Sequence, residues 1–196
     1  MDSQNQLDLK ILAAFCFNTL IAKLDKKELP NYPDGLEDPK YPIFVTWTKG
    51  PESDLRGCIG TFQGQRLSKI LGQYSLISAL QDDRFDPISK AEVPELQVGV
   101  SLLVNFTSIQ DPLAWEVGKH GIEISFEKNG RPYNGTFLPE VAPEQGWDQR
   151  ETLEYLVRKA GYSKGFESVR DSMRAKTYES LKVKMSFDEY VKFKGL

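Results

Sequence analysis

The sequence Leu-Arg-Gly-Cys-Ile-Gly-Thr-Phe at residues 55–62 decides how this chain is organised. It follows a β-branched and aromatic run at 43–48 across a polar loop, and the two segments together predict a β-hairpin. Glycine inside a strand is unfavourable unless something must approach the backbone closely. Gly57 and Gly60 therefore predict a close approach to the backbone of this strand.

The side chains of the octet are expected to divide between the two faces of the strand, because successive residues point in opposite directions. One face carries the side chains that could meet a ligand, Arg56, Cys58 and Phe62. The other face is expected to join the core, and it carries Leu55, Ile59 and Thr61.

Length and composition predict an ordinary globular protein of one domain or two small lobes. The chain has 196 residues, 40% of them hydrophobic, and a formal net charge of −3, which argues against a general nucleic-acid binder. No apolar run approaches the ~20 residues that span a bilayer, and no basic leader precedes the apolar stretch at 11–17. The two cysteines form no disulfide framework. We therefore expect a cytoplasmic or nuclear protein that is neither secreted nor membrane-bound.

The remaining elements alternate helices and strands without strict βαβ order. The spacing predicts helices over 4–24 and 65–80, a helix opened by Asp148 and closed by Gly161, and a short final helix from Ser186. Strands are predicted over 98–106 and 178–185, with a hairpin that turns at Asn129-Gly130. These elements predict an α+β fold with antiparallel sheets.

Cys58 is the sharpest candidate for chemistry. Arg56 on the same strand face would stabilise its thiolate, and the single histidine, His120, is the only imidazole base available. The alternative is that Cys58 is a small residue in a tight strand and His120 a hydrogen-bonded turn residue. Two cysteines and one histidine cannot supply the four nitrogen and sulfur ligands of a structural zinc site, and no phosphate-binding loop is present. We predict no metal and no cofactor.

Two further groups of polar residues allow either a functional or a structural reading. Asp83 and Arg84 lie in an acidic turn before Pro87. In a functional site, Asp83 would serve acid–base chemistry and Arg84 would clamp a ligand. In a purely structural turn, the acidic side chains would accept hydrogen bonds from backbone N–H groups. Glu140, Glu144 and Trp147 would form a recognition surface, although core packing of Trp147 is an equal alternative.

Several blocks of this sequence resemble the AMMECR-type domain family. The octet at 55–62 is similar to its signature, and 83–87, 119–121, 138–148 and 158–162 resemble further blocks in family order. The resemblance covers about residues 9–196 and implies one domain with two lobes. A larger lobe would comprise 1–106 and 166–196 and a smaller inserted lobe 107–165, with the signature side chains facing a cleft between them.

The resemblance implies no established reaction, so two functions are carried forward. The first is a binding protein that holds a protein segment or a large ligand, with Arg56 and Arg84 as hydrogen-bond donors. Gly57 and Gly60 would then give access to the backbone, and the opposite rim would carry Glu140, Glu144 and Trp147. The second is a cysteine-dependent enzyme in which Cys58 acts with Arg56 and with His120 or Asp83. Nucleic-acid binding is a third and weaker possibility, marked by steep salt dependence.

Overall fold

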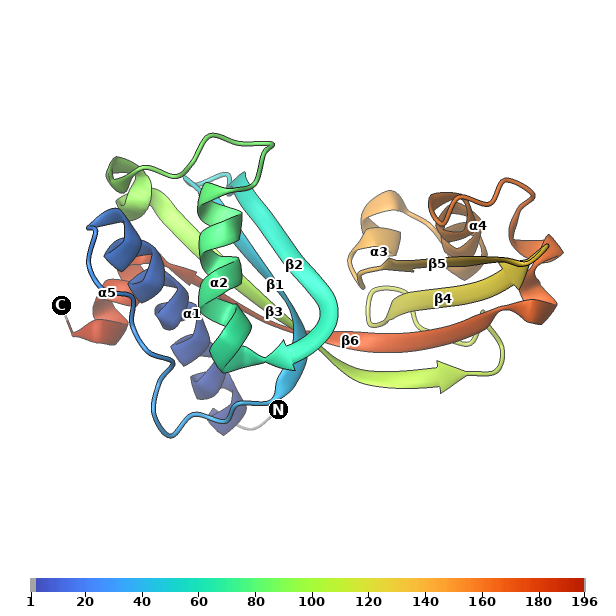
Figure 1. The fold of residues 1–196 in the computed structure, drawn as a ribbon, viewed down its shortest axis with the longest axis horizontal. Coiled ribbons are helices and arrows are strands. Elements are labelled where there is room, and N and C mark those ends of the chain that lie inside the picture. Colours follow the sequence, from blue (N-terminus) through green and yellow to red (C-terminus); the bar gives the residue numbers. More distant parts are fainter. Residues whose placement is uncertain (1–2, 196) are drawn as a thin grey trace. The chain divides into compact units, whose positions relative to one another are not determined.

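The computed structural model describes residues 3–195, and Figure 1 shows its arrangement of helices and strands. The α-helices are α1 (Ser3–Leu24), α2 (Leu67–Leu80), α3 (Val141–Gln145), α4 (Gln149–Lys159) and α5 (Phe187–Lys194). The strands are β1 (Lys40–Lys49), β2 (Asp54–Arg66), β3 (Leu96–Ile109), β4 (Gly121–Lys128), β5 (Arg131–Phe137) and β6 (Arg174–Ser186). They are hydrogen-bonded in the order β2–β1–β3–β6–β4–β5 in an antiparallel sheet. The predicted α+β class is confirmed.

The chain divides into two compact units. Unit 1 comprises the described residues up to Leu102 and from Leu181 onward, and unit 2 comprises Leu103–Ser180. Strands β3 and β6 contribute residues to both units. The lobe boundaries expected from the sequence, at 107 and 165, stay a prediction.

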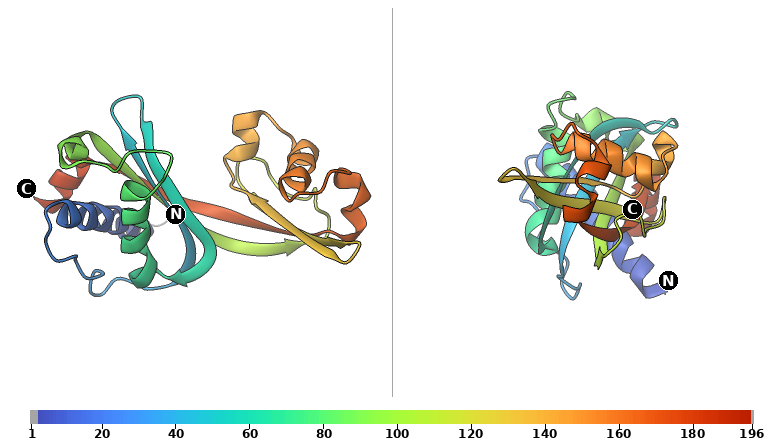
Figure 2. Two further views of the ribbon diagram at one scale, coloured as in Figure 1. Left: turned by 45° about the horizontal axis from the view of Figure 1, so that its top comes forward. Right: turned by 90° about the vertical axis from the view of Figure 1, so that its right-hand side faces the viewer.

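In unit 1, α1 and α2 lie over one face of β1, β2 and β3, as both views show (Figure 1, Figure 2). The sheet residues beneath them are large and apolar, because Ile43, Val45 and Trp47 alternate along β1 and are fully buried. The indole nitrogen of Trp47 donates a hydrogen bond of 3.0 Å to the carbonyl oxygen of Ser75 in α2. The helix backbone therefore satisfies the one polar atom of this side chain.

Gly57 marks the place where α2 meets β2 most closely. A Cβ atom at Gly57 would lie 1.7 Å from the carbonyl oxygen of Ser78, so only glycine fits there. Gly60 has a different neighbour, because its cross-strand partner is Phe44 and a Cβ would lie 2.3 Å from that ring. The predicted close approach is therefore made by the chain itself. The expected role of both glycines in giving a ligand access to the backbone stays a prediction.

An irregularity in the β1–β2 register corrects the prediction for Leu55. Trp47 pairs with Gly57, but the next residue, Thr48, pairs with Leu55, so Arg56 is an extra residue at a bulge. A bulge of one residue interrupts the alternation of faces on which the prediction rested. Leu55 is 40% exposed and does not join the core.

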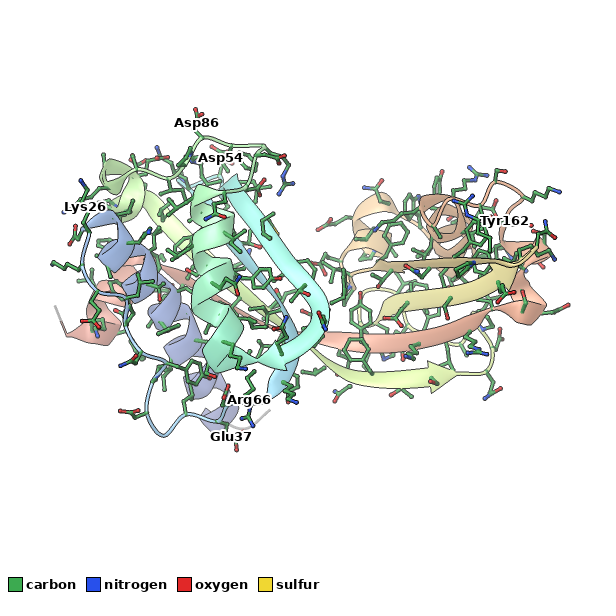
Figure 3. All side chains as sticks on the ribbon, in the orientation of Figure 1. Lys26, Glu37, Asp54, Arg66, Asp86 and Tyr162 are labelled. Atoms are coloured by element: carbon green, nitrogen blue, oxygen red, sulfur yellow. The ribbon has the colours of Figure 1, made fainter. Side chains whose placement is uncertain are left out.

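Unit 2 is built on the β4–β5 hairpin, whose turn residues Asn129 and Gly130 both have positive φ, 53° and 73°. This is the turn that the sequence predicted. Helix α4 begins at a capping box in which Asp148 and Glu151 exchange side-chain and backbone hydrogen bonds. The core between them is apolar and includes Trp115, Ile124, Leu153, Leu156 and Tyr162, the last of which is labelled in Figure 3.

The predicted helices and strands differ from those of the structure at their ends and in short elements. Strand β6 begins at Arg174, earlier than the expected 178, and the short helix α3 was not predicted because Pro143 lies inside it. A 3-10 helix, η1 (Lys90–Glu95), also lies between α2 and β3, where the sequence predicts no element. Among the residues that the structure describes, no helix has both the length and the apolar character needed to cross a membrane.

Candidate functional site

Strand β2 is the edge strand of the sheet in unit 1, and at Cys58 its free edge is covered by two side chains. The backbone N–H of Cys58 donates to Asp82 Oδ2 at 2.9 Å, and Arg84 Nη2 donates to the Cys58 carbonyl oxygen at 3.1 Å. Asp82 and Arg84 therefore satisfy the two backbone groups that a neighbouring strand would otherwise satisfy. We call Thr46, Cys58, Asp82 and Arg84 the Cys58 site.

Asp82 and Arg84 are bonded to each other as well as to the strand. Arg84 Nε donates to Asp82 Oδ1 at 2.8 Å, and Arg84 Nη2 donates to Oδ2 at 2.6 Å. The Asp82 carboxylate is buried, with 4% of its residue surface exposed. The hydrogen bonds from Arg84, followed by the backbone N–H groups of Cys58 and Arg84, hold the pKa of Asp82 well below its usual range. Asp82 is therefore ionised at neutral pH.

The Cys58 side chain is half-buried and faces Thr46, its cross-strand partner in β1. Thr46 Oγ1 donates a hydrogen bond of 3.1 Å to Cys58 Sγ. The sulfur of Cys58 thus accepts a hydrogen bond from the neighbouring strand. The hydrogen bonds to Asp82 are the main cause that raises the pKa of Arg84, and attraction to Cys58 adds a smaller contribution.

Arg56 is directed elsewhere, to the loop between α2 and β3. Its Nε donates to Glu92 Oε1 at 2.9 Å, and its Nη2 donates to the carbonyl oxygen of Asp86, which is labelled in Figure 3. The hydrogen bond from Arg56 is the main cause that lowers the pKa of Glu92 to about 2. The side chain of Arg56 is thus hydrogen-bonded to residues other than Cys58. The expected role of Arg56 as activator of the Cys58 thiolate stays a prediction.

An aromatic pair lies next to the Cys58 site on the same two strands. The Phe44 ring covers Gly60 and meets Phe62 edge to face, with ring centroids 5.0 Å apart and planes at 66°. Phe62 is 42% exposed. This pair provides apolar contact surface beside the thiol and the guanidinium.

The expected site residues fall in both units. Unit 1 holds Arg56, Gly57, Cys58, Gly60, Asp83 and Arg84, and unit 2 holds His120, Glu140, Glu144 and Trp147. Of the first group, the structure brings Cys58 and Arg84 into direct contact. Asp83, the expected proton carrier, is exposed, and the buried carboxylate of the same turn is Asp82. The sequence offers no signal that tells these neighbouring acids apart.

His120 is hydrogen-bonded at one ring nitrogen and lies near a carboxylate at the other. Its Nδ1 accepts a hydrogen bond of 3.1 Å from the backbone N–H of Glu116, so in the neutral ring the proton lies on Nε2. Nε2 is 3.7 Å from Glu179 Oε1, and Glu179 also accepts a hydrogen bond of 2.9 Å from Asn105. These contacts agree with the alternative interpretation of His120 as a hydrogen-bonded turn residue.

Trp147 packs largely within unit 2. Its ring stacks on Tyr155, with centroids 4.1 Å apart and planes at 10°, and meets Phe137 at 5.9 Å. It is half-buried against the core of unit 2. Glu144 is exposed and Glu140 is half-buried. These contacts favour the packing interpretation of Trp147, and the recognition role of the three residues stays a prediction.

Metal ligation finds no support in the residues described. Within 3–195 no group of three or more histidine, cysteine, aspartate or glutamate side chains is arranged to hold a metal ion. Asp82 is engaged with Arg84 and with the backbone of Cys58, so its oxygens are already used. The chemistry that the Cys58 site supports is hydrogen bonding by Arg84 and nucleophilic chemistry by the Cys58 sulfur.

The fold and the site define an α+β protein with an antiparallel sheet. Its edge strand β2 carries Cys58, and the ion pair of Asp82 and Arg84 covers the backbone of the strand at that residue. A model of the AMMECR1 family matches residues 13–183, and the chain belongs to that family. An uncharacterized protein of Arabidopsis thaliana is 42% identical over 188 residues, covering 93% of this chain and 87% of that protein. An uncharacterized protein of Schizosaccharomyces pombe is 40% identical over 188 residues, covering 94% and 96%.

A solved structure shows the same fold. The crystal structure of an uncharacterized protein of Pyrococcus horikoshii superposes with a TM-score of 0.69 and covers 90% of this chain and 91% of that one. The two sequences are 24% identical. The resemblance to a known family is thereby confirmed, and the family is one of uncharacterized function.

Proposed function

We propose that this chain is a binding protein that holds a protein segment or another large ligand against the Cys58 site of unit 1. The observation that carries the proposal is the geometry of Arg84. Its Nε and Nη2 are held by Asp82 and Cys58, and none of the contacts that it makes among residues 3–195 uses Nη1. The side chain is 53% exposed. The two N–H donors of Nη1 thus remain for a ligand, on a guanidinium whose other nitrogens are held in place.

A fixed arginine fork beside an aromatic pair suits a peptide. Its donors match the carbonyl oxygens and carboxylates of a chain, and the Phe44–Phe62 pair offers apolar surface for a neighbouring side chain. Because Asp82 already holds the guanidinium in place, a ligand would bind without first ordering a flexible arginine. This preorganisation supports binding as the function.

Acid–base catalysis receives less support from the same residues. The lowered pKa of Asp82 makes it a weak proton acceptor at neutral pH, and Nδ1 of His120 already accepts a hydrogen bond from the Glu116 N–H. A cysteine-dependent reaction remains the second candidate. It is favoured by the Thr46 hydrogen bond to Cys58 Sγ and by the attraction between Cys58 and Arg84.

Selection of peptides from a random library on the whole chain tests the binding proposal. We expect the selected peptides to shift the amide NMR signals of Cys58 and Phe62, and Arg84→Gln to weaken their binding about tenfold or more. Arg131→Gln in β5 is the matched control, since Arg131 is exposed and lies outside the site. Peptides that bind the Arg84→Gln variant as tightly as the original chain would overturn the proposal.

A further inference from the structure

Unit 2 carries a depression of about 350 Å³ between β3, β4 and β6 that the Cys58 site does not involve. Its charged lining comes from Glu123 in β4 and from Arg174 and Lys176 in β6. Glu123 pairs directly with Lys176, and Ser125 pairs directly with Arg174. Directly paired residues of antiparallel strands point to the same face, so these four side chains lie together.

That face is opposite to the core of unit 2. The β4 residues that alternate with Glu123 and Ser125 are Ile122, Ile124 and Phe126, all of which are buried in the core. In β6, Arg174 and Lys176 are exposed, whereas Ala175 between them is buried. The depression therefore opens on the polar face of the sheet.

The charges of the depression are unbalanced. Lys176 Nζ lies 3.7 Å from Glu123 Oε1, so one cation is compensated by one carboxylate. Arg174 has no ion-pair partner among the residues that the structure describes. The depression thus carries a net charge of one positive unit, on an exposed guanidinium with five donor hydrogens.

Neutral donors accompany this guanidinium. The hydroxyl groups of Ser108 and Ser125 and the amide of Gln110 line the same depression. Its lining also includes Met173, which is buried in the unit 2 core, and Ile109, which packs against that core. A charged hydrogen bond is stronger beside such an apolar surface than in bulk water.

We propose that this depression binds the oxyanion group of a small organic anion, either a carboxylate or a phosphate. Arg174 is the principal anchor, and the hydroxyl groups of Ser108 and Ser125 complete its coordination. The volume falls in the range of about 300–1,000 Å³ that is typical of small-molecule sites. Glu123 disfavours ligands of high negative charge, because its carboxylate remains at the edge. The site is independent of the function proposed for Cys58.

Titration of the whole chain with inorganic phosphate, and separately with malonate, tests this site at constant ionic strength. We expect one of the anions to shift the amide NMR signals of Ser108, Ser125 and Arg174 with a single saturating curve. Arg174→Gln should weaken that binding at least tenfold. Preference for phosphate identifies a phosphorylated ligand, and preference for malonate identifies a carboxylic acid.

Two further variants separate a built site from general surface charge. Glu123→Gln should tighten anion binding severalfold, because it releases Lys176 and removes a repulsive carboxylate. Arg131→Gln removes the same charge as Arg174→Gln from the same unit but from outside the depression, and it should leave the affinity unchanged. Equal effects of the two arginine variants, or an absence of shifts with both anions, would overturn the proposal. A well-dispersed amide spectrum shows that each variant is folded.

Discussion

Asp82 and Cys58 are joined across the surface of unit 1, because the backbone N–H of Cys58 donates to Asp82 Oδ2 at 2.9 Å. The carboxylate is buried and is also bonded to Arg84, so one side chain both covers the strand edge and holds the guanidinium. The acidic turn and the glycine-containing strand are therefore parts of one structure. The function proposed for the Cys58 site depends on this relationship.

Asp82→Ala should destabilise the chain by about 2–3 kcal/mol, because it leaves Arg84 and the Cys58 N–H without their buried acceptor. Urea unfolding followed by circular dichroism measures the change. Asp83→Ala is the control, since Asp83 is exposed, and it should change stability by no more than about 0.5 kcal/mol. Equal effects of the two substitutions on the free energy of unfolding would show that the buried contacts of Asp82 do not stabilise the chain.

Gly57→Ala should destabilise the chain by about 3 kcal/mol or more, since its Cβ would lie 1.7 Å from a helix carbonyl oxygen and α2 would have to move. Gly64→Ala in the same strand meets its nearest atom only at 3.6 Å and should cost about 1 kcal/mol or less. Thermal unfolding of both variants gives the comparison. A Gly57→Ala variant as stable as Gly64→Ala would contradict the close packing of α2 on β2.

The ion pair between Arg56 and Glu92 should make stability depend on acid pH. The pKa of Glu92 is about 2 in the folded chain, against about 4.3 in an unfolded one. Its contribution is therefore complete above about pH 4.3 and is lost as the pH falls toward 2, because the unfolded state then binds the extra proton. Urea midpoints measured between pH 2 and pH 6 should fall less steeply in Glu92→Gln than in the original chain. If the urea midpoints of the two proteins fell equally with pH, the pair of Arg56 and Glu92 would not contribute to the acid dependence of stability.

Cys58 should react with iodoacetamide much faster than Cys16. Cys16 is fully buried in α1, and burial raises the pKa of its thiol to about 12, whereas Cys58 is half-buried beside Arg84. Mass spectrometry across a pH series measures both rates in one sample. Fast labelling of Cys58 well below pH ~8.5, the usual thiol pKa, would strengthen the cysteine-dependent alternative. Equal rates at the two cysteines would contradict the structure.

Local sequence determined most of the elements of this protein. Several features depend only on residues close together in the chain, so they can be predicted from the sequence without knowing the tertiary structure. They are the turn at Asn129-Gly130, the capping box of Asp148 and the hydrophobic periodicity of the helices and strands. The family blocks also identified the class of protein. These features are local because their geometry is set by backbone preference and by neighbouring side chains.

Tertiary structure decided what the sequence left open. Three features depend on residues that are distant in the sequence. They are the burial of Asp82 rather than Asp83, the contact of Gly57 with Ser78 and the pairing of Arg56 with Glu92. The bulge at Arg56 likewise appears only when β2 is paired with β1. Such choices depend on which elements pack together, because burial and charge pairing are properties of the assembled surroundings and not of the residue type.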